Sequence, residues 1–270
     1  MRFRTYIAKA LLAGLSLTLT ATPAAAQDPL HLSLNYDGSL FLKVLDVSIE
    51  QVLDGDGFSA SAHIRTSGIL ALFRKLDLKA ESQGRLENAV VLPKTFSYLN
   101  TDGKKNRHVT ALWSAGDVTT LSQPHYPNMG DPPATREQKL EAADPLTVLT
   151  RITVLPPGQT PCQGVGQFYD GKQRYDIEYI YKGSAPAEAR ERHLGLTNTL
   201  RCGLVYREVA GFKKKPPDQR SQGLRRDVTI GLGRLGPGGP WVISFLRADT
   251  FLGAAEIDLV NVSMNGEHRN

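Results

Sequence analysis

The fold is decided by the stretch Cys162–Tyr181, which reads C-Q-G-V-G-Q-F-Y-D-G-K-Q-R-Y-D-I-E-Y-I-Y. Two runs rich in apolar and aromatic residues flank the dipeptide Asp170-Gly171. An Asp-Gly pair between two such runs is typical of a tight turn between antiparallel strands. We therefore expect a β-hairpin here. A polar, Ala-rich connection then leads to a further strand, Thr199–Val209, which carries the second cysteine.

The same pattern recurs along the chain. The sequence D-G-D-G at Asp54–Gly57 separates two runs of alternating residues and predicts another hairpin. D-x-D-G also opens calcium loops, but Arg65 stands where such a loop needs a bidentate Glu, so the hairpin is favoured. The remaining expected strands are Leu30–Tyr36, Leu40–Leu53, Phe58–Thr66, Leu76–Leu86, Val90–Leu99, Asn106–Trp113, Val118–Leu121, Asp227–Leu235, Trp241–Ala248 and Ala254–Met264.

Short helices are expected between the strands. Ser67–Lys75 has a capping residue at its start and basic residues at its end. Thr135 and Gln138 stand in the positions of a capping box. Asp144-Pro145 forms an N-cap and first-turn proline pair that opens a further helix. The polar segment Ser184–Arg192 is long enough for one or two helical turns.

Taken together, the elements predict a mainly β protein. Its 25 Gly and 16 Pro residues indicate many turns and short elements. We expect a strongly curved antiparallel sheet or a partly closed β-barrel, with two or three short helices covering its concave side. The loop-like stretch Pro124–Pro133 is either a linker between two domains or a long connection inside one sheet. Because both sides have the same β character, we favour a single domain over residues 27–270 with an internal connection at 124–135.

The N-terminus has the pattern of a secretory signal. Three basic residues precede a short apolar run, Ala10–Ala21, and Ala24–Ala26 then gives a small-residue cleavage site. The alternative, an uncleaved membrane anchor, is disfavoured by that site and by the short apolar run. We therefore expect residues 1–26 to be a signal peptide cleaved after Ala26, and the remainder to be periplasmic.

Charge argues against one class of partner. Removing residues 1–26 takes away three basic and no acidic residues, so the net charge falls from +5 to +2. A nearly neutral body does not offer the broad basic surface that nucleic-acid binding needs. We expect no nucleic-acid partner.

The two cysteines agree with export. Cys162 and Cys202 are the only cysteines in the chain, and two cysteines in an exported protein most simply form one disulfide. A redox pair or a metal site is the alternative. The sequence has neither a C-x-x-C motif nor a neighbouring histidine pattern to favour either one.

The sequence contains no complete catalytic motif. Gly231, Gly233 and Gly236 match a dinucleotide fingerprint by letter, but they lie in an expected antiparallel strand with no helix following. No G-x-S-x-G elbow, P-loop or H-E-x-x-H motif is present. We expect no enzyme activity, no cofactor and no metal ligands.

A hydrolase acting on envelope polymers is the enzymatic alternative, and it would need two close carboxylates or an Asp/His pair. Asp144, Asp170 and Asp176 are the obvious acids. Each has a simpler local role, as a helix cap, a turn residue and a strand residue.

Two groups of residues are candidates for binding. Tyr175, Tyr179 and Tyr181 share one strand face, because strand side chains alternate, and they can line a pocket for an apolar ligand or simply belong to the core. A basic loop can be solvated or can contact anionic lipid headgroups in a peripheral membrane interaction. Its candidate residues are Lys213, Lys214, Lys215, Arg225 and Arg226.

Several segments together resemble an exported proteobacterial family, the domain of unknown function numbered 3108. They are D-P-L-T at Asp144–Thr147, Cys162–Asp176, Cys202–Phe212, Gly55–Ala71 and the closing run Ala248–Leu259. The resemblance implies a β-rich exported protein with an intradomain disulfide, and it brings no catalytic residues. Trp241–Arg247 departs from the pattern that the resemblance implies, so the final hairpin is expected to pair differently.

These observations predict a non-enzymatic periplasmic protein of the cell envelope. It would bind a lipid, another apolar ligand or a protein partner on the concave face of its sheet. A purely structural scaffold is the third alternative, beside the hydrolase.

Overall fold

The structure is a computed structural model. It describes residues 28–68, 71, 75–87, 90–101, 106–156, 158–214, 228–250 and 253–269. The expected signal peptide lies outside these residues, as does most of the expected helix Ser67–Lys75.

The described residues form one antiparallel sheet of 14 strands. Along the sheet the order is β7-β6-β5-β4-β3-β2-β1-β13-β12-β11-β10-β9-β8, and β14 pairs with β13. Neighbours in the sheet are therefore neighbours in sequence everywhere except at the β1–β13 junction. The strands are β1 Leu30–Leu40, β2 Leu42–Asp54, β3 Gly57–Thr66, β4 Asp77–Glu87, β5 Val90–Asn100, β6 Arg107–Ser114, β7 Asp117–Gln123, β8 Val165–Tyr169, β9 Arg174–Ser184, β10 Leu196–Ala210, β11 Val228–Leu235, β12 Trp241–Thr250, β13 Gly253–Met264 and β14 Glu267–Arg269.

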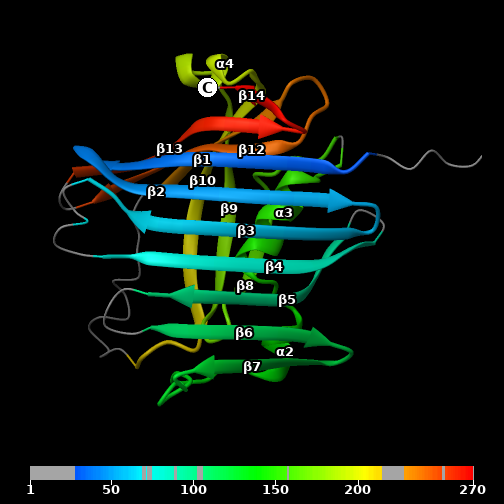
Figure 1. Ribbon diagram of the computed structural model, residues 1–270, viewed down its shortest axis with the longest axis vertical. Helices are drawn as coiled ribbons and strands as arrows, with labels where there is room; N and C mark the ends of the chain where they lie inside the picture. Colours follow the sequence, from blue (N-terminus) through cyan, green and yellow to red (C-terminus); the bar gives the residue numbers. More distant parts are fainter. Residues whose placement is uncertain are drawn as a thin grey trace, which may run out of the picture.

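The sheet curves strongly, as predicted. In Figure 1, β1–β7 run side by side across the view, while β9 and β10 cross behind them. The outermost strands, β7 and β8, are not paired with each other, so the barrel is not closed. The predicted fold class, a curved antiparallel sheet with short helices, is confirmed.

Side chains and one bridging segment hold the open edges together. Ala143 makes an isolated parallel bridge with Phe168 of β8, and its backbone exchanges hydrogen bonds of 3.0 and 2.9 Å with Gln167 and Tyr169. The hydroxyl of Tyr169 lies 2.9 Å from Oγ1 of Thr120 on β7. We call this contact between the β7 and β8 edges the seam.

Three helices are described: α2 Arg136–Leu140, α3 Pro145–Thr153 and α4 Ala189–His193. The capping box of Thr135 and Gln138 precedes α2 as predicted. Asp144 caps α3 and Pro145 occupies its first turn, also as predicted. α4 falls within the polar segment where one or two helical turns were expected.

α3 lies inside the curve and joins its two halves. Leu146 packs with Phe58 and Phe96 of β3 and β5. On the other side, Ile152 packs with the cluster around Cys162 and Cys202. Burying a large apolar side chain contributes roughly 1.5–3 kcal/mol, so α3 links the strands on its two sides through several such contributions.

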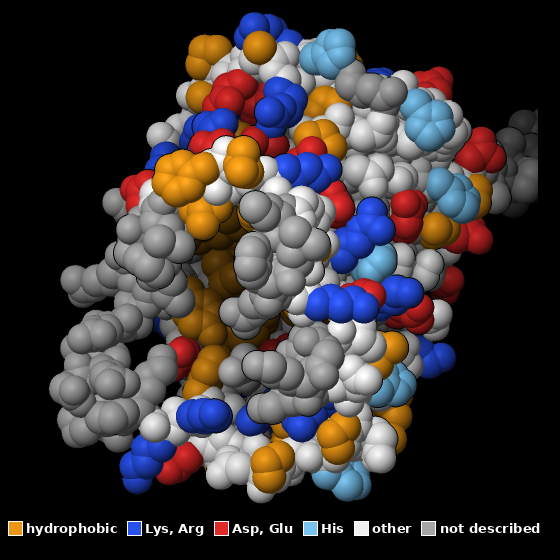
Figure 2. Space-filling model, turned by 60° about the vertical axis from the view of Figure 1, so that its left-hand side comes forward, with side chains coloured by type: hydrophobic (Ala, Val, Ile, Leu, Met, Phe, Trp, Pro, Cys, Tyr) orange, Lys and Arg blue, Asp and Glu red, His pale blue; other side chains and the backbone are white. Residues whose placement is uncertain are grey.

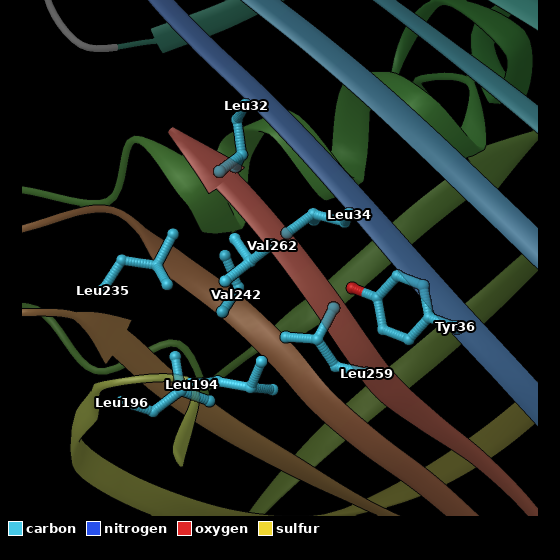
Figure 3. Close-up of a cluster of buried hydrophobic side chains, with 9 residues drawn as sticks. All are labelled: Leu32, Leu34, Tyr36, Leu194, Leu196, Leu235, Val242, Leu259 and Val262. Atoms are coloured by element: carbon cyan, nitrogen blue, oxygen red, sulfur yellow. The ribbon is translucent and has the colours of Figure 1, made fainter. Parts of the chain in front are cut away.

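The junction of the first and last long strands has its own core (Figure 3). There, β1 lies beside β13, and their buried side chains pack together with residues from β10–β12 and the end of α4. The cluster contains Leu32, Leu34, Tyr36, Leu194, Leu196, Leu235, Val242, Leu259 and Val262. This cluster joins β1 to the C-terminal strands of the sheet.

The connection at 124–135 returns to the sheet. The amide of Gly211 donates to the carbonyl of Pro132 over 2.8 Å, and the amide of Asp131 donates to the carbonyl of Phe212 over 2.9 Å. The final strands pair as a plain meander, with β12 between β11 and β13. The glycines of the rejected dinucleotide fingerprint lie in β11 and the turn after it.

Candidate functional site

One part of the concave face is covered by α3 and is packed with small residues. Ala60, Ser82 and Ala111 occupy cross-strand positions in the row that also holds Gln51 and Phe96. Short side chains at these positions leave room for a helix.

Polar contacts fix α3 against this row. The side chain of Gln51 pairs with two hydroxyls of the helix, those of Thr150 and Thr153, at 3.3 and 2.9 Å. All three residues are buried, so these hydrogen bonds satisfy groups that would be costly to leave unpaired. They also establish that the side of β2 bearing Gln51 is the concave one.

Further along the same face the side chains are large and aliphatic. Val47 lies on the same side of β2 as Gln51, because alternate residues share a face. The strand register continues from Val47 to Ile64 of β3 and Leu78 of β4. All three are only half-buried, although they point into the curve of the sheet.

The opposite wall has the same character. Leu204 and Leu246 pack at the margin of the cluster that contains Ile152, and Ile257 is the cross-strand neighbour of Leu246. These side chains are half-buried as well. Leu204, Leu246 and Ile257 pack against buried clusters, and part of each side chain remains accessible.

Figure 2 shows a deep depression with hydrophobic side chains on its walls. We use the name hollow for the part of the concave face that is bordered by six half-buried aliphatic residues. They are Val47, Ile64, Leu78, Leu204, Leu246 and Ile257. Concave, mostly apolar sites of this kind are the usual binding places for small molecules.

The three tyrosines proposed from the sequence are alternate residues of β9, and each has different surroundings. Tyr175 stacks on Phe168 with ring centroids 5.0 Å apart, and it also contacts Tyr206. Tyr179 packs beside the disulfide cluster, where burial raises the pKa of its hydroxyl to about 12. Tyr181 is 48% exposed, and its hydroxyl lies 3.1 Å from Oγ of Ser184.

Tyr179 also lines a cleft of about 500 Å³ beside α3, between Val148 and the loop that leads to β8. The other two tyrosines are not among the residues that line it. The suggestion that all three form one ligand face stays a prediction. The alternation of residues in β2, β3 and β4 places Val47, Ile64 and Leu78 on one face of the sheet, but it does not give the curvature that forms the hollow.

The carboxylates considered for hydrolysis are each held in a local role. Asp144 is fully buried and accepts hydrogen bonds from Oγ of Ser82 and the amides of Leu146 and Thr147, at 3.0, 3.0 and 2.9 Å. Burial raises the pKa of Asp144, and these hydrogen bonds oppose the rise. The side chain therefore anchors α3 to β4.

Asp170 forms the turn between β8 and β9. Its carboxylate accepts from the amides of Lys172 and Gln173, at 2.9 and 2.7 Å, and burial raises its pKa. Asp176 pairs with the buried Arg174. The predicted hairpin at Asp170-Gly171 is confirmed.

Cys162 and Cys202 form a disulfide, with Cα atoms 5.5 Å apart. Both residues are completely buried, and they pack against Ile152 and Trp241. The bond ties the loop before β8 to β10, as the sequence predicted.

Of the basic candidates, Lys213 and Lys214 follow β10 and are exposed. They line a cleft of about 630 Å³ that also includes Tyr206 and Phe212. The ammonium group of Lys214 lies 3.6 Å from the carboxylate of Asp131. The other three, Lys215, Arg225 and Arg226, lie outside the described residues.

Among the residues that the structure describes, no group of three or more His, Cys, Asp or Glu side chains is arranged to hold a metal ion. Within the same part of the chain, no helix has the length and apolar character needed to cross a membrane.

Comparison with solved structures gives a distant likeness. No family model matches the sequence, and no curated protein matches it. A crystal structure of a β-barrel-like protein of the domain of unknown function DUF1849, from Brucella abortus, shares 10% sequence identity with a TM-score of 0.48. The match covers 88% of this chain and 99% of that one.

Proposed function

We propose that this chain is an exported, non-enzymatic envelope protein that holds an apolar, lipid-like ligand in the hollow of its sheet. The observation that carries the proposal is the set of large aliphatic side chains that point into the curve and yet stay half-exposed. Export is supported by the expected signal peptide and by the buried disulfide between Cys162 and Cys202.

The chemistry of the hollow favours an apolar occupant. None of its six defining side chains can donate or accept a hydrogen bond, so water inside it has few partners. An acyl chain that displaces this water gains roughly 0.8 kcal/mol for each methylene group buried. The polar end of such a ligand would remain at the open end of the hollow, in contact with solvent.

A blocking substitution tests the proposal. Ile64 points into the hollow, whereas Ser61, on the same strand, points to the convex face beside Glu50. Ile64→Trp should lower the affinity for a fluorescent fatty acid by at least about tenfold, because the indole occupies ligand volume. Ser61→Trp should leave the affinity unchanged.

The assay is a fluorescence titration of purified protein, with circular dichroism to confirm that both variants are folded. Native mass spectrometry of protein isolated from its own compartment would show whether a lipid co-purifies. If the unaltered protein does not bind the probe and carries no lipid, the proposal is wrong, and a structural scaffold is the better interpretation. Equal binding by Ile64→Trp and the unaltered protein would place the ligand elsewhere.

A further inference from the structure

The connection between β1 and β2 exposes two large hydrophobic side chains. Phe41 is 82% exposed and Leu42 is 64% exposed, the highest values for large hydrophobic residues in the described part of the chain. Single exposed hydrophobic residues are ordinary on protein surfaces. Two consecutive residues at the tip of a turn make a small projecting patch.

Phe41 is also held in an unusual backbone conformation. Its φ is +67°, in the left-handed region that glycine adopts freely and bulky residues avoid. Yet phenylalanine occupies the position, with its ring exposed. Such a residue suggests a role that the isolated fold does not require.

A neighbouring turn helps to fix the ring. A Cβ atom placed on Gly253, the first residue of β13, would lie 2.7 Å from Cζ of Phe41. The ring therefore rests close against the backbone of Gly253. The projecting patch is supported on one side by β13.

The patch lies at the open end of the hollow. In Figure 1 the β1–β2 turn and the start of β13 are at the same end of the sheet, on the left of the view. Of the residues that define the hollow, Val47 follows Leu42 on β2 and Ile257 follows Gly253 on β13. The segment after β10, which carries Lys213 and Lys214, reaches the same side of the molecule.

We propose that the Phe41-Leu42 turn inserts into the surface of an anionic phospholipid bilayer and brings the open end of the hollow against the lipid. This inference rests on the proposed function, because it supplies the route by which a lipid-like ligand would enter. Lys213 provides complementary charge for lipid phosphates, and Lys214 provides less, because its ammonium group lies 3.6 Å from the carboxylate of Asp131. Lys43 contributes little net charge, since Asp37 and Asp46 hold its ammonium group at 2.7 and 2.8 Å.

Vesicle sedimentation tests the inference. Full-length mature protein is mixed with vesicles of phosphatidylglycerol and phosphatidylcholine, and the bound fraction is measured for Phe41→Gly and Leu42→Ser. Each variant should weaken binding by about tenfold, because an inserting apolar side chain is lost. Leu121→Ser is the matched control: Leu121 is 57% exposed but lies on β7, and its loss should not change binding.

Stability separates this role from a structural one. Glycine adopts a positive φ without strain, so Phe41→Gly should unfold at an equal or higher urea concentration than the unaltered protein. Weaker vesicle binding by a variant that is at least as stable would support insertion. Unchanged vesicle binding, or an equal loss in Leu121→Ser, would overturn it.

The soluble fatty-acid probe separates the inference from the proposed function. Phe41→Gly should bind the probe normally in the absence of vesicles. If the unaltered protein binds vesicles but not the probe, the hollow is not a ligand site, while the insertion stands. If it binds no vesicles and instead forms a dimer that Phe41→Gly breaks, the patch is a contact between copies and the insertion is wrong.

Discussion

Breaking the Cys162–Cys202 disulfide should cost a large share of the stability of this protein. The bond joins residues 40 positions apart. In the chain-entropy account, a cross-link that closes a loop of this length stabilises the folded state by about 4 kcal/mol, because it restricts the unfolded chain. That is a substantial part of the roughly 5–15 kcal/mol that separates folded from unfolded domains.

Two perturbations separate the cross-link from the packing of the sulfur atoms. The double variant Cys162→Ala/Cys202→Ala removes both. Because each cysteine is fully buried, its lost packing adds about 1 kcal/mol per site to the expected loss. Unaltered protein that is refolded in the presence of a reductant loses only the bond.

The assay is urea unfolding followed by tryptophan fluorescence, with each free energy extrapolated to water. We expect the reduced protein to lose about 4 kcal/mol and the double variant somewhat more. A reduced protein within about 1 kcal/mol of the oxidised protein would refute the reasoning. Such a result would mean that the cross-link contributes little to the stability of the fold.

Two further predictions concern a buried acid and a crowded turn. Burial raises the pKa of Asp144 in the folded state. As the pH rises, the Asp144 carboxyl therefore ionises first in the unfolded state. The free energy of unfolding should fall from about pH 4 upward until the folded-state pKa is passed. In Asp144→Asn, the urea midpoint of unfolding should change less between about pH 4 and pH 7 than in the unaltered protein. If the two pH profiles are the same, another group causes the pH dependence of stability. Gly211 has φ +86°, and a Cβ there would lie 2.0 Å from the carbonyl oxygen of Lys172, so Gly211→Ala should destabilise the protein by more than about 3 kcal/mol. Gly236, at φ +79° with open space around it, is the matched control. Gly236→Ala should destabilise the protein by only about 1 kcal/mol. If both variants lose the same amount of stability, the contact between the added Cβ and Lys172 contributes nothing.

Features set by neighbouring residues were predictable from the sequence. The turn at Asp170-Gly171, the capping box of Thr135 and Gln138, and the cap formed by Asp144 all depend on hydrogen bonds within a few positions. The strand pattern was equally accessible, because alternation along a strand is local. The disulfide followed because the chain has no third cysteine.

The hollow was not predictable in the same way. Alternation places Ile64 and Tyr181 on particular faces of their strands, but it does not say how far the sheet bends or what lies opposite. Tyr181 occupies a concave-face position beside Cys202, yet it is exposed, whereas Tyr175 is enclosed by Phe168. Those outcomes depend on curvature, on α3 and on the seam, each of which joins residues distant in sequence.

The strand order also has a consequence for how the molecule assembles. The run from β1 to β7 and the run from β8 to β13 each consist of strands paired with their sequence neighbours, and such contacts can form quickly because little loop entropy opposes them. The pairing of β1 with β13 brings together residues near the two ends of the described chain, such as Leu32 and Met264. During synthesis, one edge of β1 therefore remains unpaired until β13 has been made. The slow step of folding should be the closure of this single junction, and it is also the stage at which the unfinished protein is most exposed to pairing with other chains.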